Sequence, residues 1–202
     1  PLLVGIDPGL QHPAALIGQI PQCAFNFDHF IALSEVTHLY DVNHWRFIGD
    51  WGDKDTPDDG LLLHLSTNYQ DHFDYKAYRK VKNLFDENDR SLSLSKRNQL
   101  KEFFSKILFC CDRSAEKSEA ARKDKRSVKK IWRDEYGIET RQKFLGLDKS
   151  LNKMIRLFGE TCLCGQQRLL INNTCDLLIE AYKGGYRYSK KIRTRQIFLP
   201  CL

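Results

Sequence analysis

Three aspartates stand where secondary-structure elements are expected to begin or end. Asp7 ends the apolar run LLVGID, Asp112 ends KILFCCD, and Asp176 stands early in NNTCDLLIEAY. Carboxylates that are distant in sequence can converge at one edge of a sheet, and oxygen ligands of this kind hold Mg²⁺. Paired ions can activate water for the hydrolysis of a phosphodiester bond, with no nucleophilic side chain. The three aspartates therefore predict a Mg²⁺ site in which Mn²⁺ could substitute; we find no convincing Ser-His-Asp or Cys-His arrangement.

Each of these aspartates also has a purely structural interpretation. Asp7 precedes a Pro-Gly pair, which is typical of turns. The phosphate loop of an actin-like ATPase would need Ser or Thr where Leu10 stands. Asp112 could cap a following helix, and Asp176 could be a first-turn acid that interacts with the helix dipole. The sequence leaves these interpretations open.

The seven cysteines suggest a second kind of site. Several lie in apolar runs such as ILFCCD, so we expect reduced, buried thiols. A zinc site would use Cys162, Cys164 and Cys175. Their C-x-C spacing lacks the usual C-x-x-C pair, and no fourth ligand is evident. We therefore do not expect zinc.

The balance of charge favours a polyanionic partner. The 202 residues carry a net charge of +6, and the segment 113–133 has nine cations against three acids. Such a run is usually a solvated helix face, but it also suits nucleic-acid phosphates, as does the basic tail 183–202 with its interleaved tyrosines. The candidate phosphate contacts are Arg113, Lys117, Arg122, Lys123, Lys190, Lys191 and Arg193.

Hydrophobic patterning supplies the elements that must position these residues. Apolar runs and alternation predict strands, and spacing of three and four predicts helices. In order, we expect strands at 2–7, 13–20 and 23–36, an irregular loop at 41–59, helices over 61–85 and from an N-cap at Ser95, a buried strand at 106–112, a basic helix that ends at Gly137, a short strand at 142–145, a helix capped by Asp148 or Ser150, and a last helix before Gly184 and Gly185. This order predicts an α/β fold with an antiparallel half and a parallel half.

No apolar run reaches the roughly 18 residues of a membrane span, and the first residues lack a basic n-region. We therefore expect an intracellular protein with no membrane contact, in the cytoplasm, nucleus or mitochondrion.

Three segments resemble a known family. The segment VGIDPGLQHPAALIG (4–18) is similar to the first strand of RuvC-type Holliday-junction resolvases and their RNase H-like relatives. ETRQKFLGLDKSLNKMIRLFGE (139–160) resembles that family's strand, Gly turn and Lys-bearing helix, and NNTCDLLIEAY (172–182) resembles its last helix. The resemblance covers 1–35 and 107–185. It implies a single RNase H-like domain over 1–202, a mixed five-stranded sheet flanked by helices, with 41–98 as a helical insertion.

The resemblance also implies site residues and an activity. Asp7 and Asp176 take the roles of the first and last metal-binding carboxylates, Asp112 stands where the family has Glu, and Asn173 where it has Asp. Lys143 or Lys149 takes the role of the lysine near the scissile phosphate, and Lys149 joins the candidate phosphate contacts. The implied protein is a homodimeric, structure-selective endonuclease that cleaves branched or four-way-junction DNA in recombination and repair.

Two alternatives follow from the departures at Asp112 and Asn173, and a third from the segment GIDPG (5–9). The metal ligands could be a shifted set that includes Glu35, Asp50 or Asp53. The chain could be a non-catalytic RNase H-like protein that binds nucleic acid or supports an assembly. It could also be the RuvC-like domain of a transposon-encoded, RNA-guided nuclease of the TnpB or Fanzor type, although those usually carry a C-x-x-C zinc ribbon.

Overall fold

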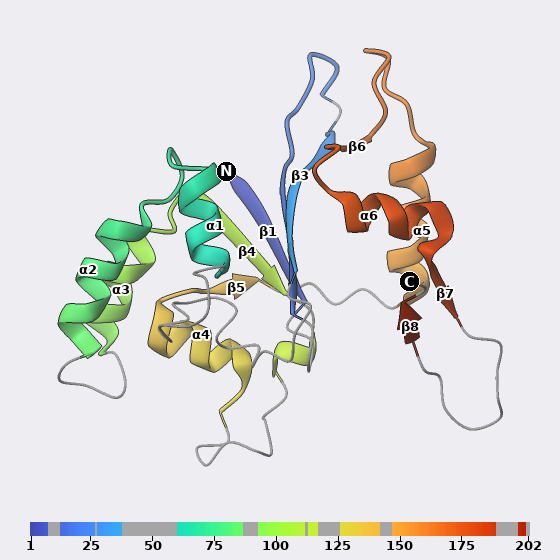
Figure 1. Cartoon of the computed structure of the whole chain (residues 1–202). Helices are drawn as coiled ribbons and strands as arrows, with labels where there is room; N and C mark the ends of the chain where they lie inside the picture. Colours follow the sequence, from blue (N-terminus) through green and yellow to red (C-terminus); the bar gives the residue numbers. More distant parts are fainter. Residues whose placement is uncertain are drawn as a thin grey trace.

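The protein is a mixed α/β fold, as the sequence predicts (Figure 1). Its structure is a computed structural model that describes residues 1–7, 13–26, 28–37, 60–86, 93–111, 113–116, 126–141, 147–188 and 198–200. The predicted irregular loop 41–59 lies outside these residues. We call 1–141 the sheet region and 147–188 the C-terminal region. No helix among the described residues is long and apolar enough to cross a membrane.

A six-stranded mixed sheet forms the centre of the molecule, one strand more than expected. Its order is β5-β4-β1-β2-β3-β6. The first three strands form an antiparallel meander, β4 and β5 continue the sheet parallel to β1, and β6 adds to β3 in parallel. The strands are β1 (Leu2–Asp7), β2 (Ala14–Gln19), β3 (Phe30–Thr37), β4 (Ile107–Cys111), β5 (Thr140–Arg141) and β6 (Leu169–Ile171).

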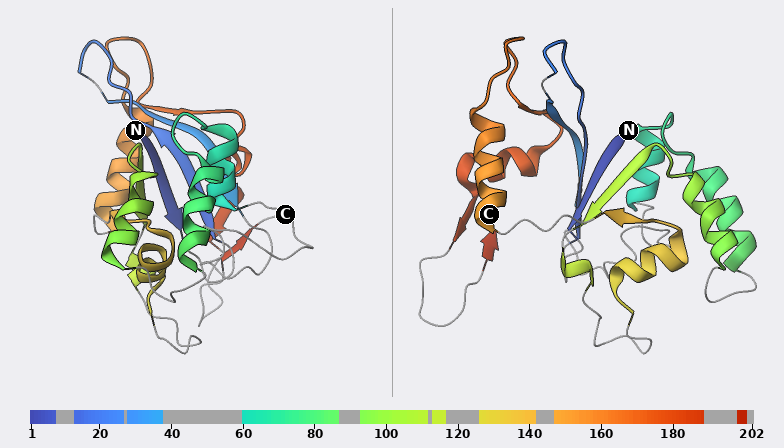
Figure 2. Two further views of the ribbon diagram at one scale, coloured as in Figure 1. Left: turned by 90° about the vertical axis from the view of Figure 1, so that its left-hand side faces the viewer. Right: turned by 180° about the vertical axis from the view of Figure 1, so that it is seen from behind.

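Four helices cover one face of this sheet (Figure 2). Leu2, Val4 and Ile6 of β1 are buried because alternate residues of a strand point to the same face. They belong to one apolar core with Leu65 and Trp132, both fully buried. The helices are α1 (Leu61–Asn68), α2 (Tyr75–Asp86), α3 (Leu94–Glu102) and α4 (Val128–Tyr136). The helical stretch within 41–98 thus shares its core with the sheet.

Helix ends agree with the sequence at one site and differ at another. The N-cap of α3 is Ser93, whose Oγ accepts from the backbone N–H of Lys96, so the choice of Ser95 was wrong. Gly137 ends α4 as expected, with a φ of 70°. A Cβ there would lie 2.6 Å from the Leu100 Cβ, so the position needs glycine for both conformation and space.

The helices of the C-terminal region lie on the opposite side of the sheet from α1–α4 (Figure 1, Figure 2). This region contains α5 (Leu147–Gly159), the sheet strand β6, α6 (Asp176–Glu180) and a π-type turn (Ala181–Gly185). The N-terminus of α5 at Leu147 precedes both caps that the sequence suggested. A small antiparallel pair follows, β7 (Tyr186–Tyr188) with β8 (Phe198–Pro200).

One strand boundary also differs from expectation. The third strand begins at Phe30 and not at Cys23, because Cys23 and His29 lie in a loop closed by a bridge between Gln22 and Asp28. The strand expected at 142–145 lies outside the described residues, and β5 ends at Arg141.

Candidate metal centre

Four metal-binding side chains from two distant loops meet in space. Cys23 and His29 lie in the loop between β2 and β3, and Cys162 and Cys164 lie in the loop between α5 and β6. Their ligand atoms all lie within 4.8 Å of one another. The two loops run side by side at the top of Figure 1, in blue and orange, and remain together in both views of Figure 2.

The first loop is shaped by a tight turn. The backbone N–H of Asn26 donates to the carbonyl of Cys23 at 2.9 Å. Asn26 has a φ of 54°, a left-handed conformation that asparagine tolerates better than most residues. The N–H of His29 donates to the carbonyl of Pro21 at 3.0 Å, which closes the loop and brings His29 next to Cys23.

The second loop repeats this design. A bridge between Thr161 and Gln167 closes it, and Gly165, with a φ of 82°, donates from its N–H to the carbonyl of Cys162 at 2.9 Å. The N–H of Cys164 points at the Cys162 sulfur at 3.4 Å. This bond supplies positive partial charge to that sulfur, which favours the thiolate that binds metal.

The distances suit a four-coordinate zinc ion. The sulfurs of Cys23 and Cys162 are 3.4 Å apart, and the sulfur of Cys164 is 3.6 Å from Nε2 of His29. A tetrahedral ion bound at ordinary Zn–S and Zn–N lengths separates its ligand atoms by about 3.5 to 3.8 Å. The sulfur separation is far too long for a disulfide, and all four side chains can therefore act as ligands.

The histidine is oriented by a hydrogen bond typical of metal ligands. Nδ1 of the buried His29 lies 2.9 Å from the carbonyl oxygen of Gln167, which can only accept. The ring proton therefore sits on Nδ1, and the lone pair of Nε2 faces the sulfur of Cys164. Metal-binding histidines usually donate their other nitrogen to a backbone carbonyl or carboxylate in this way.

Burial and hydrogen bonding also change the pKa values of the side chains in the cluster. Without metal, burial raises the pKa of the Cys162 thiol to about 11, and the hydrogen bond to Gln167 raises the pKa of His29. Metal binding needs deprotonated thiols and a neutral imidazole. A divalent cation supplies the positive charge that makes three neighbouring thiolates favourable.

The cluster overturns the expected cofactor. Among the residues that the structure describes, the group that could hold a metal ion is this Cys/His cluster and not an acidic Mg²⁺ or Mn²⁺ site. The expectation against zinc was wrong because the missing ligands lie about 140 residues earlier in the chain, beyond the reach of local spacing. Cys175, which the sequence grouped with Cys162 and Cys164, is instead buried at the N-cap of α6.

The predicted acidic site is described only in part. Asp7 is exposed at the end of β1, Asp176 is exposed as the first residue of α6, and Asn173 is exposed in the turn before it. Within the described part of the chain, Asp7 and Asp176 do not join a metal-binding group. The other two predicted members, Asp112 and Lys143, lie outside the described residues, as do Asp50 and Asp53.

The predicted phosphate contacts are also mostly outside the described residues. Lys149 is exposed on α5, and Arg113 belongs to the short 3-10 helix η1 (Arg113–Glu116). The remaining six are not described: Lys117, Arg122, Lys123, Lys190, Lys191 and Arg193.

Glu35 has a structural role that the sequence did not reveal. It lies in β3, and its two carboxylate oxygens accept the backbone N–H groups of Leu177 and Leu178 at 2.7 and 3.0 Å. These are unpaired donors at the start of α6. Glu35 therefore fixes α6 against the sheet from a distance of more than 140 residues in sequence.

No family model, curated protein or solved structure matches the chain. Its function has to be inferred from its own residues.

Proposed function

We propose that this chain is an RNase H-like nucleic-acid-binding protein whose C-terminal region is fixed to the sheet by a zinc ion. The observation that carries the proposal is the strand arrangement. A three-stranded antiparallel meander is followed by two strands parallel to β1, in the order β5-β4-β1-β2-β3. This is the antiparallel half and parallel half that the order of elements in the sequence predicts, and it supports an RNase H-like arrangement.

The partner we propose is DNA, and branched DNA above all. The net charge of +6 supports a polyanionic partner. Lysines and arginines that contact phosphates release counterions from the nucleic acid, so binding of this kind weakens steeply as salt concentration rises.

The proposed zinc ion has a structural role. Three cysteines and one histidine fill all four positions of a tetrahedral ion, and a closed set of this kind is typical of structural sites. Catalytic zinc sites keep one position open for water or substrate. The ion would join the β2–β3 loop to the α5–β6 loop and so complete the attachment of the C-terminal region.

Binding to labelled DNA tests this proposal. Fluorescence anisotropy with four-way junction, flap and duplex DNA, measured over a series of salt concentrations, should show binding with a negative slope of log K against log salt concentration. A preference for the junction over the duplex would support the branched substrate. Failure to bind any of the three would refute the proposed function.

Cleavage of branched DNA is a second candidate. It is favoured by the position of Asp7, exposed at the carboxyl end of β1, beside the parallel strand β4 that ends one residue before Asp112. A nicking assay on a junction, with a panel of divalent cations, tests it with Asp7→Asn as the matched variant. Nicking that the variant abolishes supports cleavage, and nicking that survives assigns the activity to other residues or a contaminant. A twofold dimer, measured by light scattering, belongs to this candidate.

A further inference from the structure

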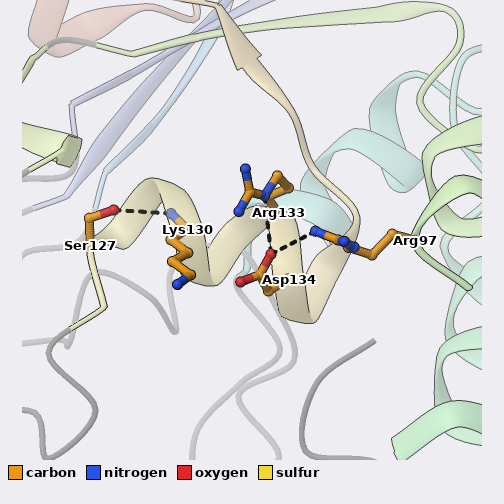
Figure 3. Close-up of polar contacts among 5 residues, drawn as sticks. All are labelled: Arg97, Ser127, Lys130, Arg133 and Asp134. Carbon is orange, nitrogen blue, oxygen red and sulfur yellow. Dashed lines mark hydrogen bonds and ion pairs between the residues drawn. The ribbon is translucent and has the colours of Figure 1, made fainter. Parts of the chain in front are cut away.

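A cleft with a volume of about 440 Å³ lies between η1, α4 and β5. It shares no residue with the Cys/His cluster, and its walls combine cations, hydroxyls and two acids, Glu116 and Glu139. Lys129, Lys130 and Arg133 of α4 line it, together with Glu116 and Thr140. Figure 3 shows Lys130, Arg133 and Asp134 of α4, together with its N-cap Ser127 and Arg97 of α3.

Both acids that line the cleft are already paired with lysines. Glu116 lies 3.5 Å from the Nζ of Lys129, and Glu139 lies 2.7 Å from the Nζ of Lys101. Neither carboxylate therefore leaves an unbalanced negative charge in the cleft.

The cations of α4 leave a surplus of positive charge. Asp134 accepts from Arg133 at 3.1 Å and from Arg97 at 3.0 Å, so one carboxylate is shared by two guanidinium groups (Figure 3). Lys130 is exposed, and among the described residues its Nζ has no acidic partner. The local surplus is two positive charges. One is that of Lys130, and the other remains when the two charges of Arg97 and Arg133 are set against the single charge of Asp134.

A buried hydroxyl completes the site. Thr140 is 9% exposed, and its Oγ1 is buried with no hydrogen-bond partner among the described residues. A buried hydroxyl without a partner costs on the order of 1–3 kcal/mol. Thr140 also lines the cleft, so a side-chain rotation that turns this hydroxyl toward a bound anionic oxygen would remove that cost.

We propose that this cleft binds a phosphate of the nucleic-acid backbone, an inference that rests on the nucleic-acid binding proposed above. Lys130 supplies a mobile ammonium charge. Arg133 uses Nε on Asp134 and retains its terminal N–H groups for a phosphate oxygen, for which the planar guanidinium is well suited. Thr140 donates from the cleft wall. Phosphate contacts of this kind position the protein on the duplex and carry no sequence preference.

Salt-dependent anisotropy with duplex and junction DNA tests the inference. Lys130→Ala should reduce the slope of log K against log salt concentration by about 1, and should weaken binding to all sequences equally. Thr140→Val should weaken binding without changing the slope, because it removes a donor and no charge. The matched control is Lys80→Ala, an exposed lysine of α2 outside the cleft, which should leave both quantities unchanged.

The outcomes separate this inference from the proposed function. If the wild type binds DNA and Lys130→Ala behaves like Lys80→Ala, the cleft is not a phosphate site, while nucleic-acid binding stands. If the wild type binds no DNA, both proposals fail. Thermal melting of each variant shows whether a loss of binding is a loss of folding.

Discussion

The sheet region and the C-terminal region are held together by different means. The sheet region has a continuous apolar core beneath α1–α4, and among the described residues no member of that core lies beyond Ile138. In the C-terminal region the buried apolar side chains, among those whose burial the structure describes, are Cys162 and Cys175. Large apolar residues that are exposed in the described part of this region are Met154, Ile155, Phe158, Leu163, Leu177 and Tyr182.

The C-terminal region is instead attached by polar contacts to β3 and the loop before it. The N–H of Asn172 donates to the carbonyl of Ala32 at 2.9 Å, and the hydroxyl of Thr174 donates to the carbonyl of Leu33 at 3.1 Å. Glu35 caps α6 nearby. The Cys/His cluster attaches the other end of β6. A region with little apolar core of its own needs cross-links of this kind, and structural metal ions commonly provide them.

Loss of the metal should give the largest effect. Chelation, or Cys162→Ser, should release the α5–β6 loop because the attachment of this loop to the β2–β3 loop through the cluster is then lost. A ligand present at a thousand times its Kd contributes about 4 kcal/mol, or roughly 8–16 °C in Tm for a chain of this size. Hydrogen exchange should show lost protection at Leu169–Ile171 while β1 stays protected.

The control for this prediction is another thiol. Cys110→Ser removes a half-buried cysteine of β4 outside the cluster, so zinc content measured by mass spectrometry should stay at one ion per chain. A wild-type protein purified with zinc available but without bound zinc would contradict the prediction.

The same substitution in the two regions should have unequal effects. Leu65 is fully buried in the core, whereas Leu177 is 42% exposed. Leu65→Ala should lower the free energy of unfolding by about 2–5 kcal/mol, and Leu177→Ala by less than about 0.5 kcal/mol. Urea denaturation measures both. Similar losses would show that Leu177 is covered in solution, and that the two regions differ less than proposed.

The cap of α6 should give an intermediate effect. Glu35→Ala removes the acceptor for two N–H groups at the start of α6, and the loss of a capping side chain costs about 0.5–2 kcal/mol. We expect faster hydrogen exchange at Leu177 and Leu178. Glu35→Gln keeps one acceptor oxygen and should lie between the wild type and the alanine variant. Equal exchange in all three proteins would remove Glu35 from the attachment of α6.

The difference between the two regions also explains which features could be predicted from the sequence: local patterns could be, and contacts between distant segments could not. The strands of the sheet region follow from local alternation, and Gly137 follows from the chemistry of helix ends. Ser93 and Ser95 both fit a cap in SLSLSK, so propensity alone could not decide between them. The zinc ligands were missed because C-x-C and C-x₅-H each supply half a site, and only the pairing of β3 with β6 brings the halves together.

The smallest expected effect is a pH dependence within the sheet region. Burial lowers the pKa of His64, whose Nε2 lies 3.1 Å from the hydroxyl of Ser34. The Ser34 hydroxyl in turn lies 2.7 Å from that of Tyr69. A histidine in the unfolded chain has a pKa of about 6.5. Below about pH 6.5 the unfolded chain therefore binds more protons than the folded protein. Stability is therefore complete above about pH 6.5 and falls as the pH drops toward the folded pKa.

His64→Gln isolates this effect, because glutamine can still donate to Ser34 but does not titrate. Urea denaturation between pH 5 and pH 7.5 should give a shallower loss of stability for the variant than for the wild type, with the curves meeting at the upper end. Since the zinc ligands are the same in both proteins, acid release of the metal cancels in the comparison. Parallel curves would show that His64 is protonated as easily in the folded protein as in the unfolded chain, and that the sheet region owes its stability to apolar packing without this contribution.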